Sequence, residues 1–262
     1  MNNKNPFYVF SAGATVGTLG GLIGLGGAEF RLPLLIGIFG FKALPAVILN
    51  KAMSLAVVTS ALPFRATSVP WNSLFDHWKI IVTLLAGSLI GAWQGASWAT
   101  RLRAKTLYRT LAVLLVAIAI VLVLGHNTNA EKIPMLSGWG QSIVGAITGF
   151  GIGVVASLMG VAGGELLIPT IVLLFGADLK LAGSLSLAVS LPTMLVGFAR
   201  YSKDQSFEVI RGQLPFVFIM VAGSLVGAFI GSRLLGIIST NDLLPILAGI
   251  LVISAFKVWH HD

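Results

Sequence analysis

The chain has 262 residues, of which 56% are hydrophobic and only 10% are charged, and its formal net charge is +8. A soluble domain carries about a quarter charged residues, so this composition excludes a soluble enzyme domain. The apolar runs are long and unbroken, which excludes an outer-membrane barrel with its alternating strands. The composition therefore predicts an all-α polytopic membrane protein.

The apolar runs fall into two length classes. A spanning helix needs roughly 20 apolar residues, and two runs, 30–39 and 166–175, are far shorter. Each short run follows a glycine-rich break and carries a proline near its start, Pro33 or Pro169. In chain order, the predicted segments are 7–25, 30–39, 43–64, 78–99 and 107–124, followed by 143–159, 166–175, 179–199, 214–235 and 243–258.

A shift of 136 residues aligns the two halves of the chain without a gap. It places Gly24 on Gly160 and Glu29 on Glu165, and the same register holds as far as the last segments. Chance matches between glycine-rich stretches would not keep one register over a whole half, so the sequence predicts two tandem homologous repeats. Repeat 1 covers residues 7–125, a linker covers 126–138, and repeat 2 covers 139–258.

Loop charges predict that the two repeats have opposite orientations. The loop before the last segment of repeat 1 holds Arg101, Arg103, Lys105 and Arg109, whereas its equivalent, 237–245, holds no Lys or Arg. Because basic loops stay on the cytoplasmic side, we expect these two loops on opposite sides. Each inverted repeat would then contain a broken or re-entrant helix pair plus three spanning helices, with both termini in the cytoplasm.

The paired breaks are the first candidate site. Glycines permit the turn, and the restarting helix exposes N–H groups whose dipole attracts anions. Transporters built from repeats place their sites at such breaks, although the glycines could also serve only to pack a tight hairpin. The candidate residues are Gly26, Gly27 and Ala28 in repeat 1, and Gly163 and Gly164 in repeat 2.

Glu29 and Glu165 follow the breaks directly, and two roles are open to them. A carboxylate inside a membrane can relay protons. A carboxylate in the first turn can instead stabilise the dipole of its own helix. Arg31 is a candidate partner for Glu29, but repeat 2 has Leu167 at that position.

Polar residues near the middle of segment 43–64 are the second candidate site. Lys51 lies among apolar residues, where a lysine costs about 2.5–3.5 kcal/mol to insert, so we expect it to face a cavity unless it snorkels to the interface. Asn50 and Ser54 are four residues apart and share a helix face. Their equivalents are Ser186 and Ser190. These side chains would line a central cavity that suits a small oxyanion.

Two further groups of residues have simpler interpretations. Arg65 and Arg200 lie near the ends of equivalent segments and could serve as gates for an anion or as interfacial anchors. Glycines recur at every fourth position in segments 78–99 and 214–235, a spacing that lets helices approach closely.

The chain has no cysteine, and its four histidines fall in predicted loops or at the C-terminus, so we expect no metal site and no cofactor.

The doubled glycine break with a following proline, in two tandem halves of this length, resembles the TauE/SafE family of sulfite exporters. The resemblance covers nearly the whole chain. It implies export of small sulfur-containing anions, namely sulfite, thiosulfate or an organosulfonate such as sulfoacetate. Repeat 1 departs from the glycine run typical of the family, because Ala28 stands where repeat 2 keeps Gly164.

These observations together predict a secondary transporter that exports such an anion across the bacterial inner membrane by alternating access. The alternatives are an anion channel or an uptake transporter for a related small oxyanion. The sequence offers no catalytic dyad, so an enzyme is not expected. The expected partners are the anionic substrate and membrane lipids, with no nucleic acid; proton coupling stays open, and the sequence specifies no oligomeric state.

Overall fold

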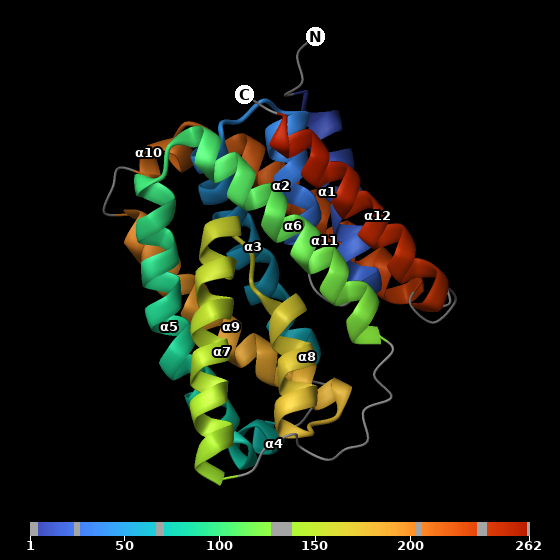
Figure 1. Ribbon diagram of the computed structural model, residues 1–262. Coiled ribbons are helices and arrows are strands. Elements are labelled where there is room, and N and C mark those ends of the chain that lie inside the picture. The colour runs from blue at the N-terminus through green and yellow to red at the C-terminus, as the bar shows by residue number, and fades with distance from the viewer. Residues whose placement is uncertain are drawn as a thin grey trace.

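The computed structural model describes residues 5–23, 27–66, 71–126, 138–202, 206–234 and 240–260. These residues form twelve α-helices and, within the same ranges, no strand (Figure 1). In chain order the helices are α1 (Pro6–Ile23), α2 (Ala28–Gly37), α3 (Ala43–Ala66), α4 (Trp71–Asp76), α5 (Trp78–Arg101), α6 (Ala104–His126), α7 (Gly138–Met159), α8 (Gly164–Phe175), α9 (Leu179–Ser202), α10 (Ser206–Arg211), α11 (Leu214–Leu234) and α12 (Thr240–Trp259).

Among the described residues, five helices are long and apolar enough to cross a membrane: α3, α5, α7, α9 and α11. In an apolar solvent a helix is stable because it pairs every interior backbone N–H and C=O within itself. The all-helical polytopic class predicted from the composition is therefore confirmed.

The helix bounds follow the 136-residue shift found in the sequence. The helices α2, α3, α5 and α6 each begin 136 residues before α8, α9, α11 and α12, respectively. The helices before the two breaks, α1 and α7, end at Ile23 and Met159, which are separated by the same interval. Equivalent sequence positions therefore occupy equivalent places along equivalent helices.

The two halves of the chain exchange their packing partners. Helix α1 packs along α11, and in the equivalent contact α7 packs along α5. Glycines allow this close approach: a Cβ on Gly87, Gly91 or Gly95 would collide with the backbone of α7, and one on Gly223 or Gly227 with that of α1. The predicted packing role of these glycines is confirmed.

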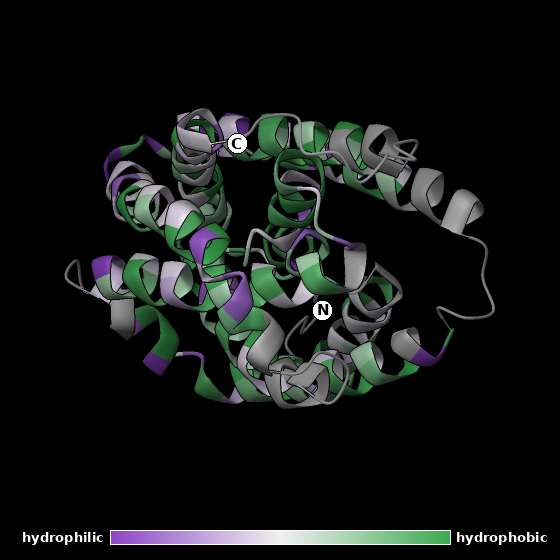
Figure 2. Ribbon diagram, turned by 90° about the horizontal axis from the view of Figure 1, so that it is seen from below, coloured by the Kyte–Doolittle hydropathy of each residue, from purple (hydrophilic) through white to green (hydrophobic). Residues whose placement is uncertain are grey.

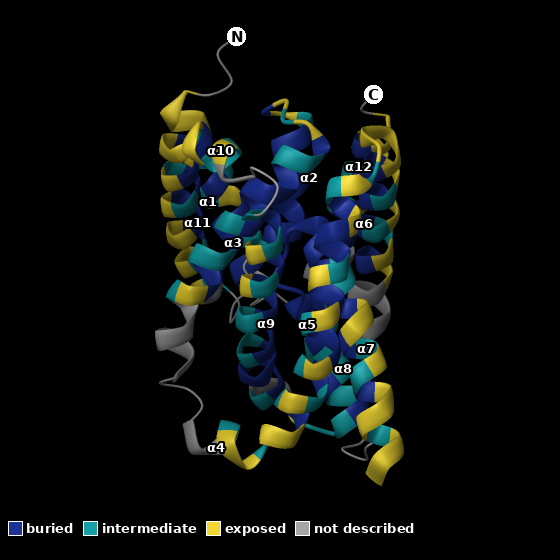
Figure 3. Ribbon diagram, turned by 90° about the vertical axis from the view of Figure 1, so that its left-hand side faces the viewer, coloured by how far each residue is buried: buried dark blue, intermediate teal, exposed yellow. Residues whose placement is uncertain are grey.

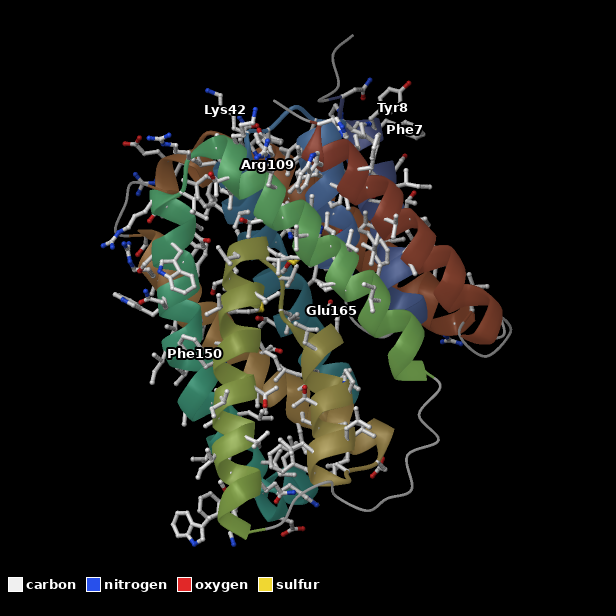
Figure 4. All side chains as sticks on the ribbon, in the orientation of Figure 1. Phe7, Tyr8, Lys42, Arg109, Phe150 and Glu165 are labelled. Carbon is white, nitrogen blue, oxygen red and sulfur yellow. The ribbon has the colours of Figure 1, made fainter. Side chains whose placement is uncertain are left out.

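The two ends of the molecule carry different elements. Both termini and the short helix α10 lie at one end, whereas the short helix α4 lies at the other (Figures 1 and 3). Because α4 connects α3 to α5 and α10 connects α9 to α11, equivalent connections lie at opposite ends. The labelled side chains of Lys42 and Arg109 lie at the end that carries the termini (Figure 4).

The helices divide into an inner and an outer set. Buried residues gather along the middle of the bundle (Figure 3), and the fully buried side chains there include Leu35, Met53 and Met194. Large hydrophobic side chains such as Trp139, Phe218 and Ile253 are exposed on the outer helices α7, α11 and α12, and hydrophobic colouring extends to the periphery (Figure 2). This outward apolar surface is what a bilayer would cover.

Candidate functional site

The two helix breaks occur at the glycines that the sequence singled out. Gly27 precedes α2 with a φ of 70°, and Gly163 precedes α8 with a φ of 81°. This left-handed backbone conformation favours glycine because other L-residues carry a steric penalty there. Gly27 and Gly163 are buried, and Glu165, at the start of α8, lies midway between the two ends of the molecule (Figure 4).

Arg31, in the first turns of α2, is the largest fully buried side chain among the described residues. Its Nη1 donates hydrogen bonds to Asn50 Oδ1 at 3.4 Å and Ser54 Oγ at 3.3 Å, and its Nη2 donates to Ser224 Oγ at 3.3 Å. Its Nε has no hydrogen-bond partner in the described ranges. These hydrogen bonds all go to neutral side chains, so the positive charge keeps the capacity to bind an anion.

Asn50 and Ser54 join the two breaks to each other. Asn50 Nδ2 donates to the carbonyl oxygens of Ala28 at 3.0 Å and Met159 at 3.1 Å. Ser54 Oγ donates to the carbonyl oxygen of Gly160 at 3.3 Å. The carbonyl groups of Met159 and Gly160 lie at and just after the end of α7, where helical partners are missing. Asn50 and Ser54 therefore hold the two breaks in place, while their side-chain oxygens accept hydrogen bonds from Arg31.

Lys51 faces a different part of the molecule from Asn50, because adjacent residues on a helix are about 100° apart. It is fully buried, and its Nζ donates to the carbonyl oxygen of Ala156 at 3.3 Å, near the C-terminal end of α7. A Cβ on Gly197 would lie 3.3 Å from Lys51 Nζ and even closer to Ser157 Oγ. Snorkelling to the interface is therefore wrong for Lys51.

The equivalent face of α9 is polar but carries no cation. Ser186 Oγ donates to the carbonyl oxygen of Gly183 at 2.8 Å within its own helix. Ser190 is buried, and its Oγ has no hydrogen-bond partner among the residues that the structure describes. Leu167 and Leu187 stand where the first half has Arg31 and Lys51, so the positive charge of this centre comes from one half of the chain.

Glu29 and Glu165 bring the two halves together. The exposed fraction of each side chain is 3% or less, and the two carboxyl groups lie within hydrogen-bonding reach of each other. The charge of Arg31 also acts on Glu29. The two residues that the sequence marked separately thus form one carboxyl pair at the centre of the molecule.

Of the gate candidates, the structure describes the side chain of Arg200 but not that of Arg65. Gly26 and the side chain of Arg65 lie outside the described part of the chain. Arg200, in the last turn of α9, donates from Nε to Ser97 Oγ at 2.8 Å and stacks over the Trp93 ring at 5.8 Å. A partly exposed arginine on an aromatic ring suits an interfacial anchor, and its role as a gate stays a prediction.

Sequence reasoning passed over two members of this centre, Arg31 and Ser224. The sequence indicates Arg31 only as a partner for Glu29, because repeat 2 has no cation at the equivalent position. A charged residue in the first turn of a short apolar segment was the signal that could have identified it. Ser224 approaches Arg31 from α11 across 193 positions of sequence, and no local pattern could indicate that contact.

Across the described residues, no three His, Asp or Glu side chains are grouped as metal ligands would be. The buried polar groups are instead two cations, hydroxyl and amide donors, and a carboxyl pair. Such donors can bind and release a small anion inside an apolar bundle.

Comparison with known proteins identifies the family of the chain. A family model described as sulfite exporter TauE/SafE matches residues 9–258. A protein of Methanocaldococcus jannaschii named "probable membrane transporter protein" is 25% identical over 253 residues, which cover 91% of this chain and 90% of that protein. No solved structure matches the chain. Since the family model spans the chain almost from end to end, the protein belongs to the TauE/SafE family and is a multi-pass membrane transporter.

Proposed function

We propose that the protein is a secondary transporter that exports a small sulfur-containing anion, namely sulfite, thiosulfate or an organosulfonate such as sulfoacetate, across the bacterial inner membrane. The observation that carries the proposal is the full burial of Arg31, with its hydrogen bonds donated to neutral side chains. The nearby Glu29 offsets part of its charge, but none of these hydrogen bonds goes to a carboxylate, so the guanidinium can still bind an anion directly. Its planar fork matches the oxygens of a sulfur oxyanion.

The anion binds where donors from both halves converge. Arg31 is the principal cation, and Lys51, which points away from Asn50 toward Ala156 and Ser157, adds positive charge at a second position. The remaining contacts come from side chains on α3 and α9 and from backbone N–H groups at the two breaks. These residues are Asn50, Ser54, Ser186 and Ser190, with Gly26, Gly27, Ala28, Gly163 and Gly164.

The two halves, residues 7–125 and 139–258, form an inverted repeat joined by the linker 126–138. The opposite positions of α4 and α10 support this topology (Figures 1 and 3). The units that move are not the sequence halves themselves, because α1 packs along α11 and α7 along α5. Alternating access follows if one mixed bundle rocks against the other around the central breaks.

The end that carries both termini faces the cytoplasm. The basic loop with Arg101, Arg103 and Lys105 joins α5 to α6 at that end (Figure 1), as the positive-inside rule requires. An anion that leaves through the opposite end of a negative-inside cell gains about 2.3 kcal/mol per charge per 100 mV. Export down this potential is therefore favourable.

Purified protein in liposomes tests this function. We expect saturable efflux of radiolabelled thiosulfate, competition by sulfite and sulfoacetate, and counterflow when unlabelled anion is present on the far side. A channel would give flux without counterflow. Absence of saturable flux for all three anions would contradict the proposal.

A further inference from the structure

The carboxyl pair of Glu29 and Glu165 has no assigned role in anion binding. The two residues occupy the same position in the two halves, in the first turns of α2 and α8. These helices start at the centre and run toward opposite ends (Figure 1), and their first turns bring the two carboxyl groups within hydrogen-bonding reach of each other. A membrane carboxylate at such a junction is a candidate for proton movement.

The hydrogen bonding of the pair is incomplete when both groups are ionised. An ionised carboxylate can only accept hydrogen bonds, so neither group can satisfy the other. Within the described ranges, both oxygens of Glu29 and both oxygens of Glu165 lack a hydrogen-bond partner. One proton on the pair would turn one carboxyl into a donor and would remove the repulsion between two buried like charges.

The surrounding charges fit a pair that holds one proton. Arg31 and Glu165 are the charged side chains that act on Glu29, and Lys51 is engaged with the carbonyl of Ala156. A pair with one proton carries a single negative charge, which balances Arg31. Two ionised carboxylates would leave an uncompensated charge in a buried site, which is strongly unfavourable.

We infer that Glu29 and Glu165 hold one proton between them in the empty protein and take up a second when an anion binds beside Arg31, so that anion and proton move together. This inference rests on the proposed function. A bound anion brings negative charge next to Arg31, and the second proton neutralises the remaining carboxylate and so offsets one unit of that charge. The proton adds to a carboxylate oxygen from the solvent on the open side and leaves on the other side with the anion. By linkage, protons must also tighten anion binding.

Proton uptake on anion binding tests the coupling. Thiosulfate is the probe, because it does not titrate near neutral pH and so releases or binds no proton itself. We expect wild-type protein in weakly buffered detergent solution to take up about one proton per bound thiosulfate, reported by a pH-sensitive dye. Glu29→Gln and Glu165→Gln should abolish uptake, whereas Glu208→Gln, which removes an exposed glutamate of α10, should not.

Infrared spectroscopy tests the pair without any anion. We expect a protonated-carboxyl stretch at neutral pH in the empty wild-type protein and in Glu208→Gln, with its loss in the Glu29→Gln and Glu165→Gln variants. Absence of that band, or thiosulfate binding with no proton uptake, overturns the inference and leaves the anion site intact. Failure of all anions to bind, with the band present, contradicts the proposed function while retaining the proton-holding pair.

Discussion

Lys51 Nζ donates a hydrogen bond to the carbonyl oxygen of Ala156 at 3.3 Å, from the middle of α3 to the last turns of α7. The cation thus lies at the negative end of a helix dipole, where its charge is partly compensated without an anionic partner. The neighbouring hydroxyl of Ser157 has no hydrogen-bond partner among the described residues. The same lysine can therefore stabilise the end of α7 and contribute to an anion site beside it.

Replacement of Lys51 by methionine should slow thiosulfate transport in liposomes about tenfold or more, because a hydrogen bond from a charged group contributes about 1.5–3 kcal/mol. The apparent melting temperature in detergent should also fall, because the end of α7 loses its cation. Leu187→Met, at the equivalent position of the other half, is the matched control. Unchanged transport in Lys51→Met would leave Lys51 with a structural role only.

Arg31→Lys should weaken thiosulfate binding about tenfold or more, although it keeps the positive charge. A lysine ammonium is a point charge and cannot reproduce the planar fork that reaches both Ser54 and Ser224. Thermal-shift titration with thiosulfate measures the loss of affinity. Leu167→Met, at the position equivalent to Arg31, should bind as the wild type does. Equal affinity in the Arg31→Lys protein would show that only charge matters there.

Gly91→Ala should destabilise the protein by about 1–3 kcal/mol through overpacking. The new Cβ would collide with the backbone of Phe150 where α5 and α7 touch. Gly151→Ala is the matched control on α7, because that glycine has open space around its Cα, and alanine is the better helix former. Thermal unfolding in detergent compares the two variants, and a similar melting temperature for both would argue against close packing.

Single cysteines should report the inverted topology directly, because the natural chain has none. We expect Asp76→Cys, on α4, to react with a membrane-impermeant maleimide in intact cells. Glu208→Cys, on α10, should react only after permeabilisation, since the positive-inside rule places that end in the cytoplasm. Both residues are exposed. Labelling of both cysteines from the same side would contradict the inverted repeat.

Most of the candidate centre could be found from local patterns. The glycine breaks, Asn50, Lys51 and Ser54 are recognisable because a polar residue within an apolar run needs a reason to be there. Arg31 is harder to recognise, because it has no counterpart in the second half of the chain. The structure shows that the centre is asymmetric, with both buried cations in the first half, and a repeat comparison by itself hides such residues.

The sequence alone determined the helical membrane class, the two breaks and the 136-residue register. The length of the apolar runs, the positions of the glycines and the similarity of the two halves can all be seen directly in the order of residues. Only the tertiary structure decided which segments pack together. It placed α1 on α11 and α7 on α5, brought Ser224 to Arg31, and set Glu29 against Glu165. These contacts depend on close approach between helices far apart in sequence, and hydrophobicity does not select partners among helices that are all equally apolar.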